Sequence, residues 1–111
     1  MPFRKEKLAS SLGELAAQFL QETKKSTLVT VTNVEISDDE ERATIGFTVF
    51  PADKEQAALV IAKRRQKAFR AFAGSRLRTR RIPNIRFAID MGEKNRQRVD
   101  ELLREDPKPL D

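Results

Sequence analysis

The chain has 111 residues, of which 39% are hydrophobic and 35% charged, and its formal net charge is +5. It contains no Cys, His, Tyr or Trp, which excludes disulfides, thiol chemistry, the usual zinc ligand sets and any catalytic triad built on His. This length suits one domain, no apolar run approaches the roughly 20 residues of a membrane span, and no signal-peptide core follows the N-terminal charges.

The first element expected is an amphipathic helix from about residue 3 to residue 23. Its apolar residues recur at helical spacing and form a single stripe. The stripe consists of Leu8, Leu12, Leu15, Ala16, Phe19 and Leu20. Lys24, Lys25 and Ser26 then end the helix, with two cations where the helix dipole favours them.

Residues 27–36 are rich in β-branched side chains, which predicts a strand. The apolar residues change face near Asn33, with one pair before it and one pair after it. The pairs are Val29 with Val31 and Val34 with Ile36. A bulge near Asn33 would explain the change, and so would burial of both faces.

A second strand is expected over residues 42–50, where apolar and polar residues alternate cleanly, and it pairs with the first strand as an antiparallel hairpin. The acidic segment 37–41 joins the two strands. We interpret it as a solvated hairpin loop and not as a metal site, because consecutive carboxylates do not converge on one ion without a loop scaffold.

The next segment predicts a helix that bends. Asp53, with Gln56 three residues later, fits an N-cap in a variant of the capping box. The apolar stripe runs to Ala62, is interrupted by the polar residues 63–67, and resumes at Ala68. A stripe broken for a full turn indicates two helices meeting at a bend, or one helix that lifts off the sheet.

The remaining elements are shorter. Gly74 either ends the second helix or allows close packing. Pro83 disfavours helix before it, and residues 84–90 alternate as a third strand. A short, weakly anchored helix is expected over 93–104, followed by a disordered tail at 105–111. The order predicts an α+β sandwich of two layers, with helices on one face of a three-stranded sheet.

The strongest functional signal is the stretch 56–89, which holds ten cations and no carboxylate. Because the whole chain has 22 basic and 17 acidic residues, the rest of it carries a net charge of −5. The cations are Lys63, Arg64, Arg65, Lys67, Arg70, Arg76, Arg78, Arg80, Arg81 and Arg86. An ordinary solvated helix face would intersperse Glu and Asp, so the segregation predicts binding to a nucleic acid.

Other functions are less well supported by the residues. Phe69, Phe72 and Phe87 fall on predicted core faces, so shape and backbone contact with structured RNA is favoured over base stacking, while DNA stays open on charge alone. No catalytic constellation is visible, and we expect no enzyme activity, no cofactor and no metal. A basic protein–protein adaptor, a general RNA-binding module and a small enzyme are the alternatives.

Two segments resemble the ribosome-binding factor A family. VTVTNVEISDDEERATIGFTVFP, residues 29–51, resembles its strand–turn–strand, and RLRTRRIPNIRFAID, residues 76–90, resembles its arginine-rich turn, proline and last strand. The element order also agrees, over most of residues 3–104. The family's kink usually carries Ala-x-Gly, whereas this chain has Arg65-Gln66-Lys67, as expected of a divergent or reduced member.

The resemblance implies a type II KH-like domain over residues 1–104, with the order α-β-β-α-kink-α-β and a short C-terminal helix. It also implies a non-catalytic factor that binds the small (30S) ribosomal subunit and helps its rRNA mature, notably in the cold. The absence of Cys suits a reducing cytoplasm, and a monomer is expected. All ten cations are expected to bind RNA. Lys63, Arg64, Arg65 and Lys67 form one row at the bend, Arg76, Arg78, Arg80 and Arg81 a second row, and Arg70 and Arg86 extend the patch.

Overall fold

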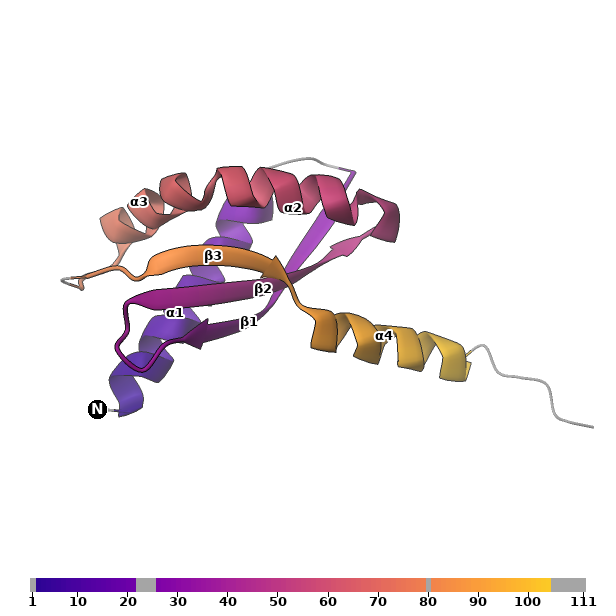
Figure 1. The fold of residues 1–111 in the computed structure, drawn as a ribbon, viewed down its shortest axis with the longest axis horizontal. Coiled ribbons are helices and arrows are strands. Elements are labelled where there is room, and N and C mark those ends of the chain that lie inside the picture. Colours follow the sequence, from indigo (N-terminus) through magenta and orange to yellow (C-terminus); the bar gives the residue numbers. More distant parts are fainter. Residues whose placement is uncertain (1, 22–25, 80, 105–111) are drawn as a thin grey trace, which may run out of the picture.

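The structure is a computed structural model that describes residues 2–21, 26–79 and 81–104. Figure 1 shows the elements in space. Their bounds are α1 Pro2–Gln21, β1 Leu28–Ile36, β2 Arg42–Phe50, the 3-10 turn η1 Ala52–Lys54, α2 Glu55–Arg64, α3 Gln66–Arg76, β3 Asn84–Ile89 and α4 Met91–Arg104. The predicted α-β-β-α-kink-α-β order with a C-terminal helix is confirmed. Lys24 and Lys25, expected to end the first helix, and the expected tail at 105–111 lie outside the described residues.

The three strands form one sheet in the order β1-β2-β3. β1 and β2 are antiparallel because a short turn joins them, and β2 and β3 are parallel because α2 and α3 form the crossover between them. The pairing of β1 with β2 shifts register between Val31 and Asn33, which confirms a bulge. The bulge restores the phase of the strand, so that Val29 and Ile36 both face the core.

The acidic segment between β1 and β2 is a hydrogen-bonded hairpin loop, as predicted. The carboxylate of Asp39 accepts bonds from the Ser37 hydroxyl at 2.6 Å and from the Glu41 N–H at 3.0 Å. These bonds, the Ser37 bond foremost, hold the pKa of Asp39 below its usual value. The loop is therefore ordered by its own side chains.

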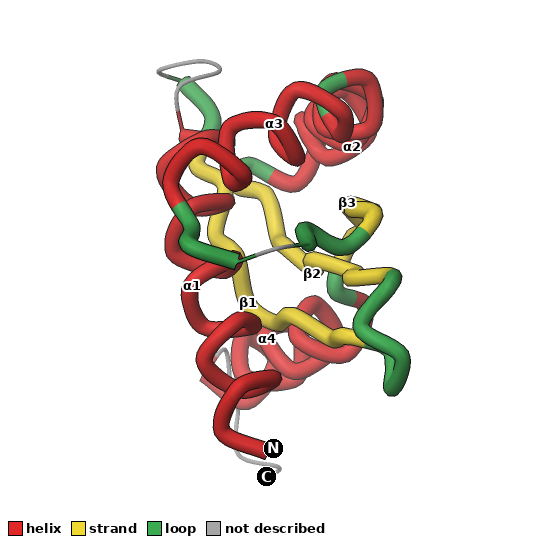
Figure 2. Tube along the Cα trace, turned by 90° about the vertical axis from the view of Figure 1, so that its left-hand side faces the viewer, coloured by secondary structure: helices red, strands yellow, loops and turns green. Residues whose placement is uncertain are grey.

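Helices α1, α2 and α3 pack on one face of the sheet and enclose the core (Figures 1 and 2). Phenylalanine rings run through the core from α1 to the sheet: Phe19 lies 5.3 Å from Phe69, and Phe69 lies 5.4 Å from Phe87 between ring centroids. The predicted core positions of Phe69 and Phe87 are confirmed, and Phe72 is half-buried beside them. The predicted two-layer α+β, KH-like fold is confirmed.

Helix α4 extends away from this body (Figure 1). Its apolar residues Val99, Leu102 and Leu103 are 53%, 61% and 73% exposed, in agreement with the expected weak anchoring. An ion pair of 2.9 Å between Lys94 and Glu55 links α4 to the start of α2. Among the described residues, no helix combines the length and apolar character that crossing a membrane requires.

Two predicted helix starts were wrong. Asp53 is not an N-cap: it lies inside η1, where the Lys54 N–H bonds the Pro51 carbonyl at 3.0 Å, and α2 begins only at Glu55 without a side-chain cap. The last helix begins at Met91 and not at Glu93, because the Asp90 carboxylate accepts the Glu93 N–H at 2.9 Å and caps the helix.

Candidate nucleic-acid interface

The bend expected in the basic stretch lies at Arg65, between α2 and α3. Arg65 has φ −100° and ψ 10°, and its N–H is shared between the carbonyls of Ile61 at 3.2 Å and Ala62 at 3.0 Å. The helical bonding resumes at once, since the Phe69 N–H bonds the Arg65 carbonyl at 2.8 Å. The negative φ explains why this kink forms without a glycine.

Two side chains hold the kink against the rest of the molecule. The amide oxygen of Gln66 accepts a hydrogen bond of 2.9 Å from the backbone N–H of Phe87. This bond satisfies a donor on the edge of β3 that faces away from β2. The guanidinium of Arg65 lies over the ring of Phe19 in α1, 4.1 Å from the centroid. The kink is thereby fixed to both α1 and β3, and Arg65 is half-buried.

Nine of the ten predicted cations are described, and Arg80 lies outside the described residues. Eight of the nine are exposed, all except Arg65. None of the nine forms an ion pair with a described carboxylate: the ion pairs in the described part of the chain involve Arg4, Lys5, Lys94 and Arg96. The charges of the eight exposed cations are thus open to an external anion.

A groove beside α3 gathers three of these cations, and we call it the α3 groove. Its volume is about 610 Å³, and it is bounded by α3 on one side and by the segment leading into β3 on the other. It is lined by Lys67, Arg70, Ala71, Gly74, Arg81, Ile82 and Asn84, with no carboxylate among them. Gly74 lies inside α3 and does not end it; a Cβ there would make only an ordinary contact, 3.6 Å from Ile82.

Arg70 has a second role in this groove. Its Nε donates to the carbonyls of Ile82 at 3.1 Å and Pro83 at 3.2 Å, and its Nη2 donates to Ile82 at 2.7 Å. These bonds fasten the segment before β3 to α3. Arg70 therefore shapes the groove as well as adding charge to it.

Arg76 and Arg78 are not among the residues that line the α3 groove. Arg76, at the end of α3, lies over the ring of Phe72 at 4.7 Å from its centroid. Arg78 lines a different groove, together with residues of α1. Of the predicted second row, Arg78 and Arg81 therefore line two different grooves.

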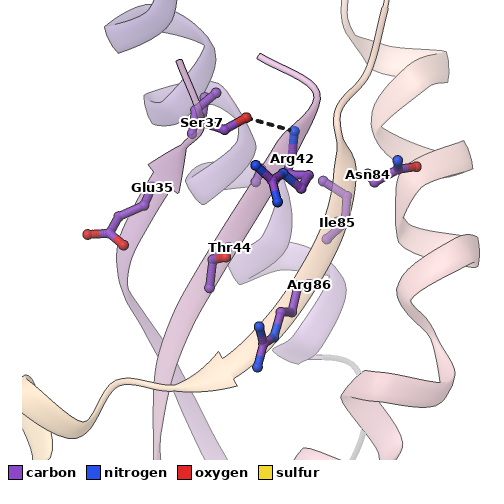
Figure 3. A pocket seen from close by; sticks show the side chains of 9 residues that line it. Glu35, Ser37, Arg42, Thr44, Asn84, Ile85 and Arg86 are labelled. Atoms are coloured by element: carbon purple, nitrogen blue, oxygen red, sulfur yellow. Dashed lines mark hydrogen bonds between the residues drawn. The ribbon is translucent and has the colours of Figure 1, made fainter. Parts of the chain in front are cut away.

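Arg86 lies apart from the other cations, contrary to the expectation that it extends the same patch. The alternation of β3 turns Ile85 and Phe87 into the core, so Arg86 points from the opposite face of the sheet. There it lies opposite Thr44 in the register of β2 with β3. Figure 3 shows it in a hollow that Glu35 and Arg42 also line. This hollow mixes charges of both signs.

Two further cations were not selected from the sequence. Arg4 and Lys7 lie in the first turns of α1 and line a groove together with Arg78. The spacing of three residues puts Arg4 and Lys7 on one face of a helix, and this was the available signal. Their proximity to Arg78 is a tertiary contact that no local pattern contains.

The comparison with protein families follows this geometry. A family model described as ribosome-binding factor A matches residues 4–103. The chain belongs to the ribosome-binding factor A family. The resemblance expected from the sequence is confirmed over nearly the whole chain.

Individual relatives agree with this assignment. Ribosome-binding factor A of Thermobifida fusca is 35% identical over 104 residues, covering 90% of this chain and 69% of the relative. That of Geotalea daltonii is 33% identical over 106 residues, covering 92% of this chain and 86% of the relative.

Solved structures agree as well. The crystal structure of ribosome-binding factor A from Thermus thermophilus matches with a TM-score of 0.65 and 27% identity, covering 77% of this chain and 94% of that chain. A homology model of the Thermus thermophilus factor, fitted into a cryo-EM map of a 30S–ribosome-binding factor A complex, matches with a TM-score of 0.63 and 26% identity, covering 72% of this chain and 88% of that chain.

Proposed function

We propose that this chain binds the rRNA of the small ribosomal subunit and assists maturation of that subunit in the cytoplasm, without catalysing a reaction. The observation that carries the proposal is the α3 groove, where Lys67, Arg70 and Arg81 meet with no carboxylate between them. Family membership supports the choice of partner, because the fitted Thermus thermophilus model belongs to a complex with the 30S subunit. Assistance at low temperature is part of the proposal.

The charges of the groove favour the phosphate backbone as the ligand. Arg and Lys contacts to phosphates release condensed counterions, and this term supplies most of sequence-independent affinity. Arg also offers forked donors that match phosphate geometry. The buried phenylalanines are occupied by core packing, so shape and backbone contact dominate over base stacking.

The first prediction tests the α3 groove by charge reversal. In Lys67→Glu combined with Arg81→Glu, two exposed cations become anions, and we expect affinity for purified 30S subunits to fall more than about 20-fold at roughly 0.15 M salt. Sedimentation through a sucrose gradient with purified subunits measures the effect. Circular dichroism checks that the variant is folded.

The matched control is Lys54→Glu combined with Arg98→Glu. Both residues are exposed and lack a described ion-pair partner, and they lie on η1 and α4, at the end of the molecule remote from the end of α3 (Figure 1). We expect a much smaller loss of binding. Equal losses in the two variants would show that only net charge matters, and association that survives nuclease digestion of the rRNA would favour the protein adaptor instead.

A further inference from the structure

Residues that follow α3 line two different grooves. Arg81 lines the α3 groove described above, and Arg78, three residues earlier, lines a second groove against α1. Residues 77–79 lie against α1, where Leu8 and Ser11 line the same cavity. We call the second cavity the α1 groove; its volume is about 630 Å³.

The α1 groove is as free of acids as the α3 groove. Its three cations are Arg4 and Lys7 from the first turns of α1 and Arg78 from the segment after α3, and no carboxylate lines it. Lys7 and Arg78 are exposed and have no described ion-pair partner. Arg4 lies 4.0 Å from Glu40, but both side chains are exposed, so this pair is weak.

The remaining lining residues suit a sugar–phosphate chain. The hydroxyls of Ser11 and Thr79 are donors and acceptors of the kind that contact phosphates and ribose, and Leu8 and Leu77 add an apolar surface. Three cations and two hydroxyl groups, contributed by α1 and by the segment after α3, thus line one acid-free cavity, as contact with a sugar–phosphate chain requires.

We propose that the α1 groove binds a second stretch of the same RNA backbone that the α3 groove binds. This inference rests on the proposed function and adds α1 to the interface. Arg78 and Arg81 then contact phosphates in two different grooves. The segment itself is held in place by the bonds from Arg70 to the carbonyls of Ile82 and Pro83.

The test neutralises the α1 groove with Lys7→Gln combined with Arg78→Gln. A phosphate contact contributes a factor of about four to five at roughly 0.15 M salt, so we expect affinity for purified 30S subunits to fall about 20-fold. The slope of log K against log salt should become shallower by about 1.5, since two contacts are lost. The control is Lys54→Gln combined with Arg98→Gln, which removes the same charge outside both grooves.

The outcomes separate this inference from the proposed function. If the wild-type chain binds and the groove variant matches the control in affinity and slope, the α1 groove is not an RNA site, while the proposed function stands. If the wild-type chain does not bind 30S subunits, the proposed function fails first. If wild-type binding survives nuclease digestion of the rRNA and the groove variant loses this remaining binding, the groove contacts a protein partner and the inference is overturned.

A gain-of-affinity variant provides an independent test. Glu40→Gln removes the carboxylate beside Arg4 and releases this cation for RNA. We expect affinity for 30S subunits to rise about twofold, with a steeper salt slope. A merely structural role of the turn would not produce this gain, and unchanged binding would remove Arg4 from the proposed contact.

Discussion

Asp90 joins the sheet to the last helix through two hydrogen bonds. Its carboxylate accepts the Thr32 hydroxyl at 2.5 Å on one oxygen and the Glu93 N–H at 2.9 Å on the other. Gly46 leaves room for it, because a Cβ at that position would lie 3.2 Å from the Asp90 Cβ. One carboxylate therefore links β1 to α4, in a place that Gly46 of β2 leaves open.

Asp90 also predicts a pH dependence. The hydrogen bond from Thr32, followed by that from the Glu93 N–H, lowers the pKa of Asp90 below its usual 3.8. A pKa that is lower in the folded state contributes stability that is fully present above the unfolded pKa and is lost as pH falls through the folded pKa. The Asp90 contribution should therefore disappear only in acid, below about pH 4.

Two substitutions separate the cap from the charge. We expect Asp90→Ala to destabilise α4 by about 1 kcal/mol, because the helix loses its N-cap, and hydrogen exchange of the α4 amides should accelerate. Asp90→Asn keeps a capping oxygen but cannot ionise, so its urea midpoint should fall less than that of the wild-type chain between about pH 5 and about pH 2.5. Parallel pH profiles for the Asp90→Asn variant and the wild-type chain would contradict the assignment to this carboxylate.

At the level of elements, the kink shows how a bend is kept without the small residues usual in its family. Arg65 adopts a conformation open to any residue, and Gln66 and Arg65 supply side-chain contacts to β3 and α1. Packing of named side chains thus replaces backbone freedom. The kink is expected to be stiff for this reason.

Gln66 offers a direct test of this view. Gln66→Ala leaves the Phe87 N–H without its acceptor, and we expect the free energy of unfolding to drop by about 1–2 kcal/mol, measured by urea denaturation. Gln66→Glu keeps an acceptor oxygen, so it should retain more stability while adding a negative charge to the basic surface and weakening 30S binding. An Ala variant as stable as the wild-type chain would show that water or another group satisfies this donor.

The elements were predictable where a local pattern was strong. The broken apolar stripe located the kink, and the phase change near Asn33 indicated the bulge. Helix starts were less predictable, because Asp53 and Asp90 are both acidic residues before a helical pattern and only tertiary contacts decide which one caps. Thr32 and Gly46 supply that context to Asp90 from distant strands.

The site was predictable as a charge and not as a shape. The acid-free stretch identified the cations of the α3 groove, and strand alternation, applied to β3, was sufficient to separate Arg86 from them. The approach of Arg78 to Arg4 and Lys7 depends on how α1 packs beside the end of α3. That arrangement follows from the packing of Phe19 against Phe69 and Phe72, which local periodicity does not encode.

On the scale of the whole molecule, the two grooves lie along the segment that leaves α3, while α4 extends from the other end of the body (Figure 1). The carboxylates of the β1–β2 turn contact Arg4 and Lys5, and those of α4 contact Arg96. Acids are thus paired mainly with cations outside the basic stretch. The field of the described cations of the basic stretch is left uncompensated, which favours rapid association with a polyanion.

This arrangement predicts a steep salt dependence of binding. If about six cations of the two grooves and the kink contact phosphates, log K for 30S subunits should fall against log salt with a slope of roughly −4 to −6. The association rate should fall with salt as well, because screening over about 8–10 Å removes long-range steering near physiological ionic strength. Equilibrium and kinetic binding measurements at several salt concentrations give the salt slope of K and the association rate. The control is Lys54→Gln combined with Arg98→Gln. A slope near zero would exclude phosphate contact as the main source of affinity. A steep slope that is the same in the wild-type chain, the α3-groove variant and the α1-groove variant would place the phosphate contacts elsewhere on the molecule.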